Sequence, residues 1–151
     1  MSHTTAFSHK PQVEKTAGFY KKFFLFAAIW NIGAGLMGVV SLAFNLKVFY
    51  NVSNYDVDYL FKIHYYNFWL FIMAMGVGFY FVSRDIFRNY AMAIVGIIGK
   101  TMAAGVWVYY YFAGQATYMV LIASAGDMLL VLLFITYLNF TAKSDKIDGI
   151  I

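Results

Sequence analysis

The chain has 151 residues, of which 62% are hydrophobic and 12% are charged, and it contains no cysteine. Soluble domains carry about 25% charged residues, so this composition excludes an ordinary water-soluble domain and favours a lipid bilayer around the apolar residues. The absence of cysteine excludes disulfides, thiolate chemistry and iron–sulfur sites. The net charge of +4 comes largely from basic residues at the ends of apolar runs, which indicates membrane topology and argues against a nucleic-acid partner.

Residues 1–18 are polar and predict a short, flexible cytoplasmic tail. Residues 19–140 predict a single transmembrane domain, and residues 141–151 a second cytoplasmic tail. Four continuous apolar runs predict spanning helices at 23–44, 65–83, 90–113 and 117–140. Each run has roughly the 20 residues that a helix needs to cross about 30 Å of hydrocarbon, whereas a β-barrel would need short alternating segments. We therefore expect an all-α fold, an integral membrane four-helix up-down bundle in contact with the lipid bilayer.

The longest connection, residues 45–64, contains a pattern that is typical of a helix. Residues 53–56 resemble a capped helix start, and Leu60, Phe61 and His64 follow at helical spacing. This pattern predicts a short helix in the outer membrane interface, and an irregular loop explains it equally well. Aromatic residues gather at both rims of the spans and favour an interface belt. An aromatic pocket for a flat lipid or a quinone is the less favoured interpretation.

Small residues on one side of several runs predict where the helices touch. The hydrophobic effect does not drive helices together inside a bilayer. Membrane helices therefore associate through the close packing that glycine and alanine permit. The first run has Gly35 and Gly38 on such a side, the second has Ala74 and Gly78 with Gly76 adjacent, and the third has Gly96 and Gly99.

Lysine and arginine are concentrated on one side of the predicted membrane. The N-terminal segment, the 84–89 connection and the C-terminal segment carry most of them, and the other side has only Lys47 and Lys62. Cytoplasmic connections are typically rich in these residues. We therefore expect both termini to be cytoplasmic in a multi-pass protein of the inner (plasma) membrane.

Two full charges, Lys100 and Asp127, interrupt the third and fourth runs. A helical rise of about 1.5 Å per residue places both near the bilayer midplane, where one charge costs between about 2.5 and well over 10 kcal/mol. Opposite charges at matching depth on consecutive helices predict a buried ion pair, and Asn31 at similar depth is expected to join it. The candidate residues of this polar centre are Lys100, Asp127, Asn31, Trp30, Thr101, Ser124 and Trp107.

The polar centre leaves two functions open. In the first, the pair relays a proton or holds a ligand, and the chain is a small-molecule or ion binding or transport protein. In the second, the pair only fixes helix packing, and the chain is a non-catalytic membrane subunit or scaffold. A homo-oligomer or a membrane complex is the expected state. The sequence contains no catalytic constellation or metal cluster, so we favour a non-enzyme and expect no cofactor and no metal.

The connection between the second and third runs contains Arg84, Asp85, Arg88 and Asn89. These residues predict an anchor at the cytoplasmic surface and a tight turn, in which Asp85 pairs with either arginine. A binding site for an acidic lipid headgroup is the alternative interpretation.

Several short motifs resemble a pattern in small, mostly uncharacterised bacterial four-helix membrane proteins, some of which are grouped as DoxX-like. The resemblance covers residues 76–138 and rests on Gly78, Arg84-Asp85, Arg88-Asn89, Gly99-Lys100 and Gly126-Asp127. It implies a four-helix bundle in a bacterial inner membrane and transfers no catalytic residue. DoxX-type proteins are associated with thiosulfate or quinone-linked oxidation, so the resemblance alone implies a third, less favoured function as a quinone-linked oxidoreductase component.

Overall fold

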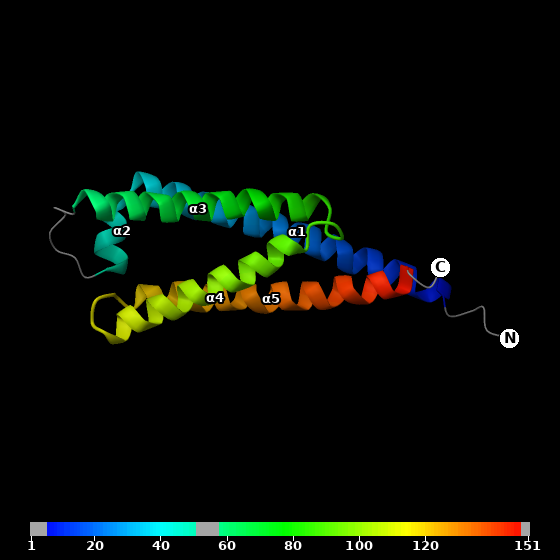
Figure 1. Ribbon diagram of the computed structural model, residues 1–151. Coiled ribbons are helices and arrows are strands. Elements are labelled where there is room, and N and C mark those ends of the chain that lie inside the picture. Colours follow the sequence, from blue (N-terminus) through cyan, green and yellow to red (C-terminus); the bar gives the residue numbers. More distant parts are fainter. Residues whose placement is uncertain (1–5, 51–57, 149–151) are drawn as a thin grey trace.

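The computed structural model describes residues 6–50 and 58–148, and it describes side chains over 12–50 and 58–144. The described part is all-α, as the sequence predicts (Figure 1). It contains five helices: α1 (Ala6–Val40), α2 (Leu42–Phe49), α3 (Tyr59–Arg84), α4 (Ala91–Phe112) and α5 (Met119–Asp148).

Four of these helices contain segments long and apolar enough to cross a membrane: Gln12–Val40, Tyr59–Arg84, Ala91–Phe112 and Met119–Ser144. Many large apolar side chains lie on their outer surfaces; Ile29 is 65%, Val40 75% and Phe112 79% exposed. Water would solvate such a surface poorly, and lipid tails solvate it well. The prediction of four membrane-spanning helices is therefore supported by both helix length and surface composition.

The helices continue beyond the apolar runs into the segments that the sequence predicts as tails. α1 begins at Ala6, within the predicted tail of residues 1–18, and α5 continues to Asp148, within the predicted tail of residues 141–151. These segments contain lysine, glutamate, glutamine and alanine, which are good helix formers. The end of an apolar run marks where hydrocarbon contact ends, and a helix that is also stable in water does not stop there.

The region between the first two spans also differs from the prediction. The first span ends at Val40 instead of residue 44, because Ser41 adopts a non-helical conformation (φ −121°, ψ 49°) and α2 begins after it. The predicted cap over 53–56 lies outside the described residues. Leu60, Phe61 and His64 do not form a separate interfacial helix, because they belong to the first turns of α3.

The four long helices associate as two pairs, α1 with α3 and α4 with α5. The pairs meet at the end of the molecule where α1 begins and α5 ends, which we call the terminal end (Figure 1). They diverge toward the opposite end, which we call the loop end, and there α2 crosses the gap between them (Figure 1).

Close packing of small residues holds the first pair together. A Cβ atom on Gly76 of α3 would lie 3.0 Å from the Ala28 carbonyl oxygen of α1. A Cβ on Gly35 of α1 would lie 2.8 Å from the Trp69 carbonyl oxygen of α3. These contacts confirm the prediction for Gly35. In α3 the close contact is made by Gly76, while Ala74 is exposed and a Cβ on Gly78 would meet the Met92 side chain of α4, so the predicted contact side of this span is wrong. Gly99 differs, because a Cβ there would meet nothing within 4 Å.

Aromatic rings join the two pairs at the terminal end. Phe134 of α5 is fully buried, and its ring centroid lies 5.3 Å from that of Phe24 in α1 and 5.0 Å from that of Phe79 in α3. Tyr137 is also fully buried, lies 4.7 Å from Phe24 between ring centroids, and donates a hydrogen bond to the Ile86 carbonyl. We call Phe24, Phe79, Phe134 and Tyr137 the aromatic core.

The first prediction tests the glycine contacts between α1 and α3. We expect Gly35→Ala to lower the thermal unfolding temperature in detergent, because the new methyl group meets rigid backbone; overpacking of this kind costs about 1–3 kcal/mol. Gly33→Ala is the matched control on the same helix, since its Cβ would meet nothing within 4 Å. Equal unfolding temperatures for the two variants would contradict this account of the α1–α3 contact.

Candidate functional site

The predicted ion pair is present between α4 and α5. Lys100 Nζ donates a hydrogen bond to Asp127 Oδ1 at 2.5 Å. The partnership of the two residues is therefore confirmed. Their complete burial is not confirmed, since the Lys100 side chain remains 11% and the Asp127 side chain 18% exposed. The pair thus lies between two helices at the edge of the packed interior.

The turn between α4 and α5 explains why these two residues meet. Gly114 has a positive φ of 74°, which glycine adopts readily. The Gly114 N–H donates to the Tyr111 carbonyl and the Gln115 N–H to the Tyr110 carbonyl, both at 3.0 Å, which is the Schellman pattern of helix ends. The chain reverses at this glycine, and Lys100 and Asp127 lie at nearly equal distances from it along the sequence.

The other predicted members of the polar centre do not join the pair. Asn31 is buried, but its Nδ2 donates to the Ala27 carbonyl of its own helix at 2.8 Å. Ser124 is also buried and donates to the Val120 carbonyl of α5 at 2.7 Å. Trp30 is 58% exposed on α1, and Thr101 is exposed on α4. The expectation that Asn31 joins the pair is wrong, because depth gives height in the membrane and not which helix is a neighbour.

The geometry of the pair limits its chemistry. Each charge already has the other as a hydrogen-bonded partner, so the pair is electrically neutral as a unit. In a medium of low dielectric constant, separating two such charges leaves each of them poorly solvated. The arrangement is therefore suited to clamping α4 against α5 and offers no unpaired charge to a ligand.

The connection between α3 and α4 is a tight turn built on side chains. Asp85 Oδ1 accepts from the Phe87 N–H at 3.2 Å and from the Arg88 N–H at 3.3 Å. Arg88 Nε lies 3.6 Å from Asp85 Oδ2, and Asn89 Nδ2 donates to the Phe81 and Asp85 carbonyls at the end of α3. Arg84 is exposed. This geometry agrees with the predicted turn and leaves the two arginines at the surface.

A pocket of about 680 Å³ lies at the loop end, where the sequence favoured an aromatic belt over an aromatic pocket. We call it the loop-end pocket. Its walls come from α2, α3, the end of α4 and the turn that follows. The lining residues are Leu46, Tyr50, Phe61, His64, Tyr65, Phe68, Trp69, Tyr110, Gly114 and Gln115. Trp107, predicted in the polar centre, lies instead near this end of α4, where it stacks on Phe49 of α2 with ring centroids 6.2 Å apart.

Hydrogen bonds fix the helix that forms one wall of the loop-end pocket. Asn45 of α2 is buried and donates to the Tyr65 hydroxyl of α3 at 2.8 Å, and that hydroxyl donates to the Gly38 carbonyl of α1 at 2.9 Å. On the opposite side, the Thr117 N–H donates to the Phe49 carbonyl at 3.0 Å and the Thr117 hydroxyl donates to the Val48 carbonyl. The sequence signals that pointed here were the aromatic residues gathered at this rim of the spans.

Two aromatic side chains of the pocket, Tyr50 and Trp69, have polar groups that are affected by burial. Burial raises the pKa of the Tyr50 phenol, so this side chain stays neutral over the physiological pH range. Trp69 Nε1 is buried and has no hydrogen-bond partner among the described residues. The Trp69 ring is held by packing, since a Cβ on Gly38 would overlap it.

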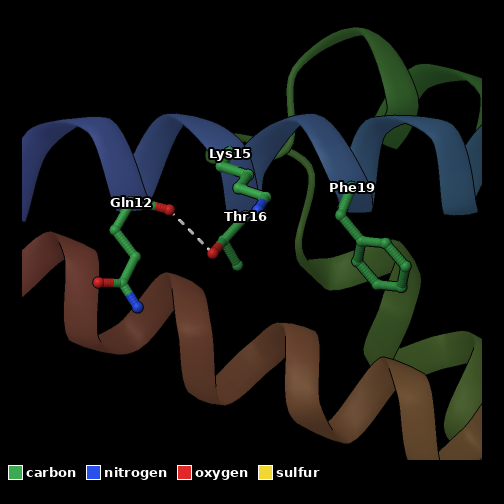
Figure 2. A pocket seen from close by; sticks show the side chains of 4 residues that line it. All are labelled: Gln12, Lys15, Thr16 and Phe19. Atoms are coloured by element: carbon green, nitrogen blue, oxygen red, sulfur yellow. Dashed lines mark hydrogen bonds between the residues drawn. The ribbon is translucent and has the colours of Figure 1, made fainter.

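A second hollow lies at the terminal end and is lined by one helix alone. It is lined by Gln12, Lys15, Thr16 and Phe19, all from α1 (Figure 2). The Thr16 hydroxyl donates to the Gln12 carbonyl within that helix at 2.9 Å. Because a single helix supplies every lining residue, no set of polar groups converges on this hollow from different elements. Among the described residues, no group of three or more His, Asp or Glu side chains is placed to hold a metal ion.

The second prediction tests the clamp. We expect Lys100→Met and Asp127→Leu each to lower stability in detergent, because each change leaves the other charge unpaired between the helices. The loss should stay below the about 3–5 kcal/mol of a fully buried pair, since both side chains keep some exposure. The double variant should lose less than the two single losses combined, because it leaves no stranded charge. Thr101→Val, at an exposed neighbour on α4, serves as the control. Additive losses in thermal unfolding would show that the two charges do not stabilise each other.

No protein-family model, no curated protein and no solved structure matches this chain. The resemblance to DoxX-like proteins therefore finds no support in these comparisons, and no family function is transferred to the chain.

Proposed function

We propose that this chain is a multi-pass protein of the inner (plasma) membrane that binds a small, largely apolar molecule in the loop-end pocket. The observation that carries the proposal is the pocket itself. Its volume of about 680 Å³ falls within the range of small-molecule sites, which are mostly apolar clefts of roughly 300–1,000 Å³ with a few polar groups. Three separate parts of the chain converge on it, as is typical of a built site.

Support also comes from the fixed position of the pocket walls. The Asn45–Tyr65–Gly38 hydrogen bonds attach α2 to the first helix pair, and Thr117 attaches it to the second. A pocket whose walls are held before binding loses less conformational entropy when a ligand enters. The polar centre predicted from the sequence is less suited to binding a ligand, because Lys100 and Asp127 are already paired with each other.

The ion pair of Lys100 and Asp127 has a structural role that supports this pocket. By holding α4 along α5, the pair keeps the end of α4 and the following turn, with Tyr110 and Gln115, in the pocket wall. We therefore assign Lys100 and Asp127 a structural role, and we no longer favour transport through the polar centre. The expected homo-oligomer stays a prediction.

We also propose that the helices cross the bilayer alternately and that both termini are cytoplasmic. The terminal end carries lysines of α1 and α5 and the arginines of the α3–α4 turn, which is the charge distribution of a cytoplasmic face. In this orientation the loop-end pocket lies in the outer half of the membrane.

The third prediction tests this orientation with single cysteines, since the chain has none of its own. We expect Gln115→Cys to react with a membrane-impermeant thiol reagent in intact cells. Glu14→Cys and Lys143→Cys should react only after permeabilisation. All three positions are exposed, so accessibility within the fold does not decide the result. Labelling of Glu14→Cys or Lys143→Cys in intact cells would reverse the proposed topology.

The fourth prediction tests binding. The probe is hexadecanol carrying a photoreactive diazirine in its chain, added to the purified full-length protein in lipid nanodiscs. We expect labelling that excess unlabelled hexadecanol prevents, and mass spectrometry should place it within residues 58–69 and 107–115. Labelling of the lipid-facing surfaces should persist under competition, because those contacts do not saturate.

Two variants show which hollow the probe occupies. Gln115→Trp should fill part of the loop-end pocket and reduce the competed labelling at least severalfold. Gln12→Trp makes the same change at an exposed residue of the terminal-end hollow and should leave the labelling intact. If no labelling is prevented by competitor, or if only Gln12→Trp reduces it, the proposed function is wrong.

A further inference from the structure

The polar and apolar parts of the loop-end pocket are separated along the membrane normal. Gln115 lies in the turn after α4, Tyr50 lies just after α2, and His64 lies in the second turn of α3. Phe68 and Trp69 lie about one turn or more further along α3, toward the middle of the membrane, at about 1.5 Å per residue. The pocket therefore has the polar side chains of Gln115, Tyr50 and His64 at its mouth, beside Phe61 in the first turn of α3, and an aromatic floor deeper in the bilayer.

The lining carries hydrogen-bonding groups without fixed charges. None of the described residues that line the pocket is a lysine, arginine, aspartate or glutamate. Gln115 has both a donor NH2 group and an acceptor oxygen, and the neutral Tyr50 phenol can donate and accept. A charged headgroup at this position would lose part of its hydration without gaining an opposite charge, which is unfavourable.

We infer that the loop-end pocket selects an uncharged amphipathic molecule with a hydroxyl or carbonyl head, and that Gln115 is the residue that recognises this head. This inference rests on the proposed binding function and adds the chemical class of the ligand. The apolar part of the ligand lies against Phe68 and Trp69, and the head lies at the mouth beside Gln115, Tyr50 and His64. An amphipathic ligand would therefore lie in the pocket in the same orientation as the surrounding lipids, with its head toward the membrane surface and its apolar part toward the membrane middle.

Four competitors with the same hexadecyl or hexadecanoyl chain test the head preference. They are hexadecanol, hexadecane, hexadecanoate and hexadecyltrimethylammonium, each titrated against the diazirine probe in the same nanodiscs. We expect hexadecanol to compete at a concentration about fivefold lower than hexadecane, the net effect of one ordinary hydrogen bond of about 1 kcal/mol. Hexadecanol should also compete better than either charged molecule.

Gln115→Leu tests the role of the amide at nearly constant size. We expect it to bring hexadecanol to the level of hexadecane while competed labelling by the probe remains. Gln12→Leu is the matched control and should keep the preference for the alcohol. The readout is the ratio of the hexadecane to the hexadecanol half-competition concentration, and a general loss of fold does not selectively change this ratio.

The outcomes separate the two proposals. If labelling is competed but hexadecanol and hexadecane are equivalent, or a charged competitor is the strongest, the inferred ligand class is wrong and the binding function stands. If the Gln115→Leu variant still prefers hexadecanol over hexadecane, Gln115 does not recognise the head of the ligand. If labelling is not competed by any of the four molecules, the binding function itself fails.

Discussion

The aromatic core at the terminal end is the contact on which the arrangement of the whole molecule depends. Phe24 and Phe79 come from the first helix pair, and Phe134 and Tyr137 come from the second. Inside a bilayer, helices gain little from burying apolar surface against each other, since lipid is equally apolar, so the association depends on close packing and hydrogen bonds. Large rings that interlock at one end hold the pairs together there and leave them free to diverge at the other. The loop-end pocket exists because of this divergence.

The two pairs reach stability by different means. α1 and α3 approach closely through glycines, where a Cβ on Gly35 or Gly76 would meet backbone or side-chain atoms of the partner helix. In the second pair, a Cβ on Gly96 of α4 would lie 2.9 Å from the Phe134 ring of α5, whereas Gly99 and Gly126 face open space. The pairing of α4 with α5 also uses the ion pair of Lys100 and Asp127 and the Schellman turn at Gly114. An ion pair tolerates a wider helix separation than a glycine contact does, because long side chains span the distance.

Sequence reasoning reached the helices and the ion pair but ranked an aromatic pocket below an interface belt, for physical reasons. Apolar run length indicates spans because every spanning backbone must satisfy its own hydrogen bonds, and opposite charges at one depth indicate a pair because each is costly alone. Neither signal reports which helix lies beside which. Asn31 has the right depth and belongs to the other pair, so it bonds to its own helix. The role of Asn45 depends on a Tyr65 partner twenty residues away, which no local pattern reveals.

The short helix α2 connects the pocket to the rest of this arrangement. A helix of eight residues is too short to be stable alone in water, so α2 depends on its partners. Its buried Asn45 bonds to the first pair, while the Val48 and Phe49 carbonyls at its end accept from Thr117 beside the second pair. Carbonyl groups at a helix end need such partners, because the helix itself supplies none. The same short segment that satisfies these groups also places Leu46 and Tyr50 in the pocket wall. The wall is therefore formed only while both helix pairs hold α2, so a change in their separation at the loop end would change the pocket itself.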